Sequence, residues 1–545
     1  MIDIKSFGFN IPNNLGNTLL EKRGIYDKDT AKKFFLSSIS EIKENISLPS
    51  ISLATERVIK AVNNNQIIGI FGDFDADGLT GTAIITRSIK KIGGKVITYI
   101  PDRERDGHGL SKEAVKSFHQ ANVQLIITVD TGSTAIEETK LAETLGIDTI
   151  ITDHHVLTGN LPSAIALVNP MLDDPVKCEY SGSGVAFKLA QAIYDKLNLD
   201  FPAELLPLAA IGTIADSSPL TGENRCIVKN GLDILGNTNL VGLKNLLEIS
   251  KGNKFYGKPN SEFVSFQIAP RLNAPGRIGD PEPALQILLN DNHSDSITIS
   301  ERLDVINQKR REYSASAWEL VSKQILNQNK HIISVELPKV PLGILGPIAG
   351  RIVETTGKPA IVYQKSDGFI KASCRSNEYT DIHKCLEETS NLMIRFGGHA
   401  AAAGFSVHNE HLEIVLDAAN KYVEKKPSKV TKKLNQPDAE ILIKHLTPDL
   451  WKFIRSMEPY GKSNHEPIFF VKEVQITNIK TGGLDKNHLK LNLLTENSSI
   501  ECIGFGLGKK SLGNNYVDIT FKLSTKNWRG KIKEQIEIID INPSN

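Results

Sequence analysis

Short runs of aliphatic and β-branched residues begin at Gln66 and alternate with segments whose apolar residues have helical spacing. The apolar runs fall at 66–73, 95–102, 123–130, 147–153 and 164–169, with helical patterns at 79–93, 111–122 and 134–146 between them. Continuous apolar strands that alternate with amphipathic helices are typical of a parallel sheet covered on both faces. The pattern therefore predicts an α/β domain.

The rest of the chain divides by changes in this pattern. A charged helical stretch at 299–329 predicts a bridge between two domains, and a second, smaller α/β unit follows. The Lys- and Pro-rich stretch 424–437 predicts a linker, and the short strands and turns after it predict a small β-barrel. We therefore expect five parts: an N-terminal cap (1–48), a larger α/β domain (49–280), a connecting helix (281–330), a second α/β domain (331–425) and the barrel (430–545).

Composition narrows the class without deciding the function. The 545 residues are 40% hydrophobic and 23% charged, with a formal net charge of +1, which neither requires nor excludes nucleic acid. We find no secretory signal and no apolar stretch near the roughly 18 residues that cross a bilayer. Five scattered cysteines fit reduced thiols and exclude a cysteine zinc site, so we expect a cytoplasmic protein.

Acidic residues collect where the predicted strands end. The first strand ends in Asp73, Asp75 and Asp77, the third in Asp130, the fourth in Asp153-His154-His155, and a later apolar helix in Asp216. Parallel strands present their carboxyl ends at one edge of the sheet, where ligands bind. A site with several carboxylates and one or two imidazoles suits Mn²⁺ or Mg²⁺ better than a metal that prefers thiolate ligands.

A more ordinary interpretation treats each Asp separately. A single Asp at a strand end is more often a helix N-cap or a turn residue. The D-x-D-x-D-G run also resembles the start of a calcium loop, but such a loop needs Glu at its twelfth position, which here is Ile84. Acids at several successive strand ends are hard to explain as caps, because buried like charges repel unless a cation lies between them. The sequence therefore favours a metal site.

The segments GDFDADGLTGTAI, VDTG, TDHH and IADSSPL resemble the ordered motifs of the DHH phosphoesterase family. PRLNAPGR (270–277), SCR (373–375) and RFGGHAAAAGF (395–405) resemble its RecJ branch with a DHHA1-type second domain, and the barrel lies where that branch carries an OB fold. The resemblance implies a metal-dependent 5′→3′ exonuclease that hydrolyses single-stranded DNA to 5′-mononucleotides in DNA repair and recombination. Ser217, Ser218 and His108 depart from the residues usual in the family.

The resemblance also assigns site residues. It implies two divalent cations, Mn²⁺ or Mg²⁺, with Asp130 as the bridge and His155 orienting the site or contacting phosphate rather than binding metal. Which of Asp73 and Asp75 is a direct ligand stays open. The implied metal ligands are Asp73, Asp75, Asp77, Asp130, His154 and Asp216.

Basic residues near glycine-rich segments are candidates to hold the substrate. Two arginines flank a predicted Gly/Pro turn in PRLNAPGR, and Ser373 with Arg375 is implied to form a pocket for the 5′-terminal phosphate. GGHAAAAG (397–404) is interpreted as a glycine turn followed by an alanine-rich helix, with His399 reaching the catalytic cleft. Candidate substrate-binding residues are Arg103, Arg105, Arg271, Asn273, Arg277, Ser373, Arg375, Gly397, Gly398 and His399.

The predicted barrel has an excess of basic residues and several aromatic residues, as expected for a domain that binds single strands. Some of the aromatics should form the barrel core and others should stack on bases: Phe469, Phe470, Phe505, Tyr516, Phe521 and Trp528. We expect a monomer that binds single-stranded DNA and works beside a helicase and a single-strand-binding protein. The alternatives are a DHH phosphodiesterase for short oligonucleotides or cyclic dinucleotides, and a non-catalytic DNA-binding scaffold, against which the full set of acids argues.

Overall fold

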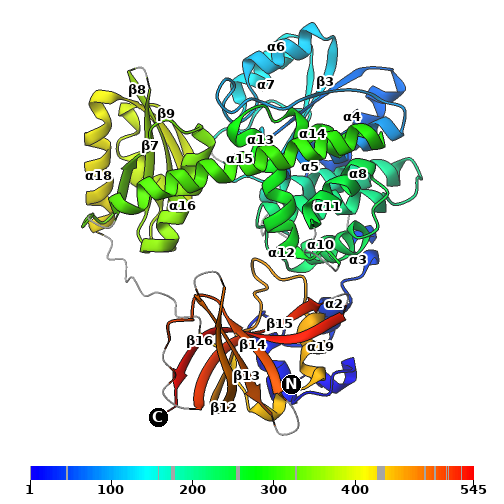
Figure 1. Cartoon of the computed structure of the whole chain (residues 1–545). Coiled ribbons are helices and arrows are strands. Elements are labelled where there is room, and N and C mark those ends of the chain that lie inside the picture. The colour runs from blue at the N-terminus through cyan, green and yellow to red at the C-terminus, as the bar shows by residue number, and fades with distance from the viewer. Residues whose placement is uncertain are drawn as a thin grey trace.

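The structure is a computed structural model with three units, two in the upper part of Figure 1 and one below them. It describes residues 2–44, 47–157, 159–173, 178–252, 258–325, 328–366, 368–425, 436–483, 486–495, 499–510, 512, 515–528 and 531–544. Most of the predicted linker 424–437 lies outside these residues. Among the described residues, no helix combines the length and apolar character needed to cross a lipid bilayer.

The first unit contains a five-stranded parallel sheet in the order β2-β1-β3-β4-β5, which confirms the predicted parallel α/β domain. Alternate residues of β1 and β3 enter two separate cores, so both faces of the sheet are covered. Ile68 and Ile70 of β1 lie in the larger core, and Phe71 lies in the smaller one with α6 and α7. The strands are β1 (Ile67–Gly72), β2 (Lys95–Tyr99), β3 (Val123–Val129), β4 (Asp148–Thr152) and β5 (Ala166–Val168). The helices are α3 (Ile39–Glu44), α4 (Ile51–Asn63), α5 (Ala76–Lys91), α6 (Lys112–Gln120), α7 (Ile136–Thr144) and α8 (Gly182–Lys196).

A helical layer completes this catalytic domain. It includes α9 (Leu206–Ala215), α10 (Gly222–Leu235), α11 (Val241–Lys251), α12 (Ser261–Phe263), η4 (Val264–Ile268), α13 (Ala269–Ile278) and α14 (Glu282–Leu289). PRLNAPGR lies in α13 with Pro275 inside the helix, so the predicted Gly/Pro turn is wrong. The Pro and Gly residues suggested a turn, but the segment packs between α9, α14 and α15 and stays helical.

The long helix α15 (His293–Ile325) leads from the catalytic domain to the second α/β unit (Figure 1). That unit has a mixed sheet in the order β6-β7-β8-β10-β9. Its elements are β6 (Ile333–Glu336), α16 (Leu345–Thr356), β7 (Ala360–Ser366), β8 (Phe369–Arg375), α17 (Ile382–Glu387), β9 (Met393–His399), β10 (Ala402–His408) and α18 (Leu412–Glu424).

The glycine- and alanine-rich segment 397–404 belongs to the antiparallel hairpin β9–β10. The predicted alanine-rich helix is therefore wrong. Ala402 and Gly404 pair with Arg375 and Ser373 of β8, so inter-strand hydrogen bonds outweigh the helix propensity of alanine.

The C-terminal strands form a closed barrel, because β12 pairs with β13 and also with β15. Its elements are β11 (Ala439–Glu440), α19 (Pro448–Ser456), β12 (Phe469–Gly482), β13 (His488–Leu494), β14 (Ser499–Gly504), β15 (Tyr516–Trp528) and β16 (Lys531–Pro543). The N-terminal helices α1 (Asn13–Glu21) and α2 (Lys28–Leu36) belong to the same unit, since Ile4, Phe9 and Leu19 lie in one core with Phe453 and Phe521. The N-terminal segment thus packs on the barrel unit.

A buried arginine of the catalytic domain joins it to the barrel unit. Arg225 of α10 is 1% exposed and stacks on the ring of Phe34, with its guanidinium carbon 3.8 Å from the ring centroid. Its guanidinium donates hydrogen bonds to the backbone carbonyls of Phe34, Ser456, Met457, Glu458 and Pro459. A single side chain therefore satisfies carbonyls from two segments of the barrel unit.

Candidate metal centre and phosphate site

The loop after β1 carries the first three acids. Asp75 is the N-cap of α5, and its Oδ1 accepts hydrogen bonds from the backbone N–H groups of Asp77 (2.9 Å) and Gly78 (3.1 Å). Asp73 differs, because its Oδ1 is buried and has no hydrogen-bond partner among the described residues. Asp75 is thus engaged by the backbone of α5, whereas Oδ1 of Asp73 has no hydrogen bond from the described residues.

Asp77 is 2% exposed and is held from the opposite side by the start of α8. The backbone N–H groups of Gly182 and Ser183 donate to its two oxygens at 2.6 and 2.9 Å. A Cβ at Gly182 would lie 2.4 Å from the Cβ of Asp130, and one at Gly212 would lie 2.5 Å from Oδ1 of Asp77. Glycine at these two positions lets α8 and α9 approach the acids closely.

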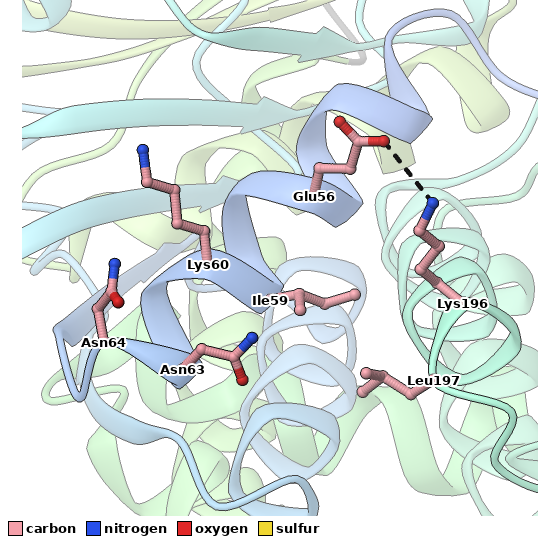
Figure 2. A pocket seen from close by; sticks show the side chains of 7 residues that line it. All are labelled: Glu56, Ile59, Lys60, Asn63, Asn64, Lys196 and Leu197. Carbon is pink, nitrogen blue, oxygen red and sulfur yellow. Dashed lines mark ion pairs between the residues drawn. The ribbon is translucent and has the colours of Figure 1, made fainter.

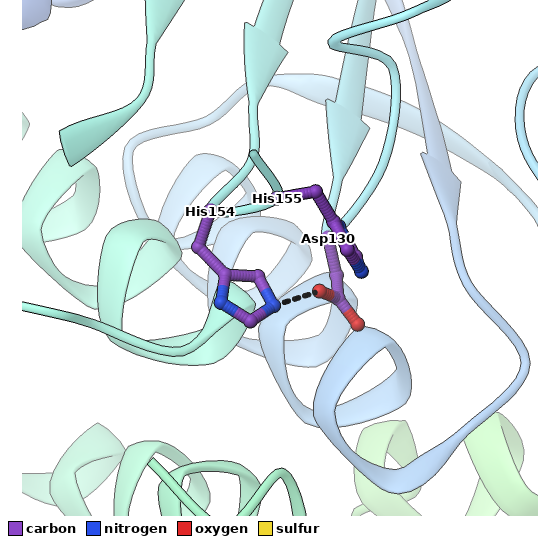
Figure 3. A group of neighbouring side chains, drawn as sticks. All are labelled: Asp130, His154 and His155. Carbon is purple, nitrogen blue, oxygen red and sulfur yellow. Dashed lines mark ion pairs between the residues drawn. The ribbon is translucent and has the colours of Figure 1, made fainter. Parts of the chain in front are cut away.

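Asp130 follows β3 with a φ of 61°, a left-handed conformation that Asp tolerates better than most residues. Its Oδ1 lies 3.1 Å from Nε2 of His154, which follows β4 (Figure 3). The same Asp130 oxygen is buried and receives no hydrogen bond from the described residues. An imidazole nitrogen and a buried carboxylate oxygen this close, with no hydrogen bond to that oxygen from the described residues, are placed to ligate the same cation.

Asp153, the first residue of the 153–155 triplet, was not assigned a role from the sequence. It is 1% exposed, and its Oδ1 accepts hydrogen bonds from Nδ1 of His155 (2.8 Å) and the backbone N–H of His154 (2.8 Å). Its other oxygen accepts from the backbone N–H of Ser133 at 2.9 Å. Asp153 therefore orients the imidazole of His155, as a carboxylate behind a site imidazole commonly does, and holds the backbone N–H groups of both histidines. Its place beside them in the triplet was the signal available in the sequence.

Asp216 ends α9 and accepts a 2.6 Å hydrogen bond from the hydroxyl of Ser218. In each of three groups, ligand atoms lie within 4.8 Å of one another, and Asp130 occurs in two of them. The groups are Asp73–Asp75–Asp130, Asp77–His154–Asp216 and Asp130–His154–His155. The structure thus brings all six predicted ligands together, with Asp130 and His154 linking the groups.

Like charges in this cluster perturb each other. Burial and the neighbouring Asp75 raise the pKa of Asp73 to about 7, and burial and Asp216 raise the pKa of Asp77 to about 6. Burial and the charges of Asp77 and Asp75 raise the pKa of Asp130 well above its usual range. The hydrogen bond to Asp153 raises the pKa of His155 to about 9. The nearby cationic groups, Arg103 and His155, do not offset the burial and mutual repulsion of these carboxylates. Together with the two buried oxygens that have no hydrogen-bond partner, this fits hard divalent cations with oxygen and nitrogen ligands.

Helix α13 supports the acidic loop and brings a basic residue to its edge. Oδ1 of Asn273 accepts from the backbone N–H of Ala76 at 2.7 Å, so Asn273 holds the loop. Arg103 donates to the carbonyl of Gly276 at 3.0 Å and lies over the ring of Phe74 at 4.1 Å. Burial lowers the pKa of Arg103, while Asp73 and Asp75 raise it, so its charge faces the acids.

Arg271 is placed elsewhere. Its Nε and Nη2 lie 3.0 and 2.6 Å from Asp304 Oδ1 on α15, and its Nη1 donates to the carbonyl of Gln267 at 2.7 Å. The guanidinium of Arg271 is engaged by these two residues and holds α13 against α15, so Arg271 is not placed to bind a substrate phosphate. Arg105 is exposed on the loop after β2, and its side chain makes no hydrogen bond or ion pair with the described residues.

A cavity of about 350 Å³ lies beside this region and is lined by Arg277, Arg375 and Arg351, with Gly346 and Pro347 at the start of α16. A Cβ at Gly346 would lie 3.0 Å from Nη2 of Arg375 and 3.2 Å from Oγ of Ser373. The absent side chain therefore leaves room beside these two groups. Arg351, which stacks on Trp318 at 4.1 Å, was missed because a lone arginine in a helix carries no signal of its own.

His399 ends β9 and is exposed, and its Nδ1 accepts a 3.3 Å hydrogen bond from the backbone N–H of Ala401. Burial and the charges of Arg375 and His155 lower its pKa. Gly398 has a φ of 137°, and a Cβ there would lie 2.4 Å from the carbonyl oxygen of Ala402, so the hairpin needs glycine at this position. Gly397 has open space around it.

The barrel aromatics divide by exposure. Phe469 and Phe521 are fully buried, whereas Phe505 is 57% and Tyr516 is 52% exposed. Phe470 is half-buried, and the side chain of Trp528 lies outside what the structure describes. Among the candidate aromatics whose side chains the structure describes, Phe505 and Tyr516 are therefore the most exposed for stacking on a base.

Another cavity, of about 550 Å³, lies between α4 and the end of α8 and is spanned by a 3.8 Å ion pair from Glu56 to Lys196 (Figure 2). None of the predicted site residues lines it.

Comparisons with known proteins agree with these three units. Residues 67–213 match the N-terminal domain of the DHH family, residues 329–425 match the DHHA1 domain, and residues 437–540 match the RecJ OB domain. The single-stranded-DNA-specific exonuclease RecJ of Bacillus subtilis is 34% identical over 96% of this chain and 67% of its own length. That of Escherichia coli is 31% identical over 91% of each chain. This chain belongs to the RecJ family.

The RecJ structure from Thermus thermophilus in complex with Mn²⁺ has a TM-score of 0.82 at 28% identity, covering 97% of this chain and 76% of that one. The family resemblance inferred from the sequence motifs is confirmed, as is the combination of two α/β domains, a long helix and an OB-like barrel. The roles of individual residues stay predictions.

Proposed function

We propose that this chain is a metal-dependent exonuclease that hydrolyses single-stranded DNA in the 5′→3′ direction and releases 5′-mononucleotides, in DNA repair and recombination. The observation that carries the proposal is the cluster of five aspartates and His154 beside the arginine-lined cavity of the second domain. The relatives named single-stranded-DNA-specific exonuclease support the substrate and the reaction class.

The ligands divide into two sets that meet at Asp130, whose Oδ1 lies 3.1 Å from Nε2 of His154. Asp73 and Asp75 would hold one cation with Asp130, and Asp77, His154 and Asp216 would hold the other. Two divalent ions bound there would activate a water and stabilise the oxygens of an in-line phosphoryl displacement. The T. thermophilus relative was solved with Mn²⁺ and with Mg²⁺, which supports either ion.

Other residues would orient the substrate. Asp153 fixes the ring of His155 through Nδ1, which leaves Nε2 free to donate to a phosphate oxygen. His399 at the β9–β10 turn would approach the scissile phosphate from the second domain. Arg103, held by the carbonyl of Gly276, would bind a phosphate oxygen next to the acidic loop.

Polarity requires a group that recognises the end of the strand, since the metal ligands do not distinguish the two ends. Ser373 and Arg375 lie together next to Gly346, with Arg277 across the same cavity. We assign them to the 5′-terminal phosphate. The barrel unit, with exposed Phe505 and Tyr516, would bind the strand farther from its end.

The three units of one chain supply all these groups, so we propose that a monomer is active. A 5′ exonuclease in the cytoplasm would act beside a helicase that unwinds its substrate and a single-strand-binding protein that covers it.

Digestion of 5′- and 3′-labelled single strands with Mn²⁺, with Mg²⁺ and with EDTA tests the proposal. We expect the 5′ label to be released first as a mononucleotide, in the presence of either ion but not in EDTA. Release from the 3′ end first would refute the polarity. Activity confined to dinucleotides or cyclic dinucleotides would support the alternative of a phosphodiesterase for short substrates.

A further inference from the structure

One continuous helical segment, residues 261–278, runs from the barrel unit to the metal centre. At its start, the hydroxyl of Ser261 donates to the carbonyl of Tyr460 at 2.6 Å. Near its end, Asn273 holds the backbone of Ala76, and a Cβ at Gly276 would lie 2.9 Å from the carbonyl oxygen of Phe74. In Figure 1, α12 accordingly lies on the side of the catalytic domain that faces the barrel, and α13 lies farther up, next to α15. The segment spans about 25 Å at 1.5 Å per residue.

One face of this segment stays accessible. Phe266, Pro270, Asn273 and Arg277 follow each other at spacings of four, three and four residues, which puts them on the same side of a helix. Each is partly or fully exposed, while Val264, Ile268 and Leu272 are fully buried against the catalytic domain. This face ends at the proposed active site, because Asn273 accepts a hydrogen bond from the acidic loop and Arg277 lines the arginine cavity.

Phe266 is the exposed end of this face. Its side chain is 68% exposed, although the surrounding helix buries other large apolar residues. It lies within a π-helical turn, Val264–Ile268, a local widening that is frequent at functional sites. Single exposed apolar residues are common on protein surfaces and need no explanation by themselves. What distinguishes Phe266 is its position on the face that joins the barrel unit to the phosphate site.

We propose that Phe266 is a stacking platform for a nucleobase of the bound single strand, between the barrel unit and the metal centre. The inference rests on the proposed exonuclease function and adds a binding subsite to it. An aromatic face stacks on any base, so the subsite guides the strand without reading its sequence.

The spacing along the helix predicts which bases Phe266 contacts. It lies seven residues before Asn273 and eleven before Arg277, or about 10 and 16 Å along the axis. At about 3.4 Å per stacked nucleotide, this corresponds to about three nucleotides from the acidic loop that Asn273 holds and about five from Arg277 at the phosphate cavity. A dinucleotide is therefore too short to reach Phe266.

The test compares Phe266→Ala and Phe266→Trp in the full chain with Leu53→Ala, a control at a 54% exposed apolar residue of α4. KM and kcat are measured in Mn²⁺ on a 5′-phosphorylated dinucleotide, a 20-residue strand, and the same strand made abasic at positions three to six. We expect Phe266→Ala to raise KM on the 20-residue strand about 5- to 150-fold, the range of one base–aromatic stack. Kinetics on the dinucleotide should stay within twofold of wild type, and Phe266→Trp should restore the KM.

The abasic strand separates stacking from a structural effect. Wild type should lose affinity on it, and Phe266→Ala should add no further loss. Equal losses on the dinucleotide and the 20-residue strand, or a loss that persists on the abasic strand, would overturn the proposal. If the wild-type chain does not digest single strands at all, the exonuclease proposal fails, and strand binding in EDTA by wild type and Phe266→Ala still decides whether Phe266 stacks on bases.

Discussion

Replacement of Arg375 by alanine tests whether the second domain recognises the 5′ end. Nη1 of Arg375 donates to the carbonyl of Cys374 at 2.9 Å, and Nη2 lies beside Gly346 and the hydroxyl of Ser373 at the arginine cavity. Nη2 is thus the group placed beside the cavity, and one charge-assisted hydrogen bond from it to a phosphate is the smallest contact expected. Such a bond contributes about 1.5–3 kcal/mol, which corresponds to about 10- to 150-fold in kcat/KM.

The assay measures kcat/KM on two strands that differ only in a 5′-phosphate or a 5′-hydroxyl. Arg375→Ala should lower kcat/KM by that factor on the phosphorylated strand and by less than about threefold on the hydroxyl strand. Lys371→Ala, which removes a cation from the same strand β8, serves as the control and should affect both substrates equally. Because Arg375 bonds only its neighbouring carbonyl among the described residues, the unfolding temperature should not change.

Equal losses on both substrates would refute the reasoning. Arg375 would then grip the interior backbone or support the fold, and the 5′ polarity would rest on family membership alone.

Asp130→Ala should abolish turnover while leaving strand binding nearly intact, because Asp130 is the predicted bridge between the two cations. Activity of this variant within about tenfold of wild type would remove Asp130 from the site, whereas His154→Ala, which removes one ligand of one cation, should regain activity at higher Mn²⁺. Metal binding should depend on pH, because protons compete with the cation for the carboxylates. The folded-state pKa values of Asp73 (about 7) and Asp77 (about 6) lie above the unfolded value, so both groups are charged and repel each other fully above about pH 7. As the pH falls below these values, protons bind and relieve the repulsion. Apparent Mn²⁺ affinity by calorimetry should therefore be about tenfold weaker at pH 6 than at pH 8, and a pH-independent affinity would contradict the assignment. Arg225→Ala should lower the unfolding temperature and expose the segment joining α19 to β12 to proteolysis. The reason is that buried backbone carbonyls lose their hydrogen-bond donor, at a cost of about 1–3 kcal/mol each. An unchanged unfolding temperature would show that water replaces the guanidinium.

The sequence by itself determined the parallel sheet and the meeting of its acids. Strand and helix periods are local properties, and parallel strands must deliver Asp73, Asp130 and His154 to one edge wherever the rest of the chain lies. The glycines among these motifs, such as Gly182, are also readable from the chain, but the contact that requires glycine there became visible only in three dimensions.

Tertiary contacts decided the rest. Arg271 and Arg277 are six residues apart in one motif, yet Asp304 of α15 neutralises the first, while the second lines the cavity of the other domain. GGHAAAAG has neither helical nor strand periodicity, so its register against Ser373 and Arg375 made it a hairpin. In the barrel, alternation along β15 puts Phe521 and Tyr516 on opposite faces of the strand, and the residues that cover the Phe521 face come from other strands of the closed sheet. In each case the deciding partner is distant in sequence, and a local pattern carries no information about which distant residue will neutralise a charge, pair with a strand or cover a ring.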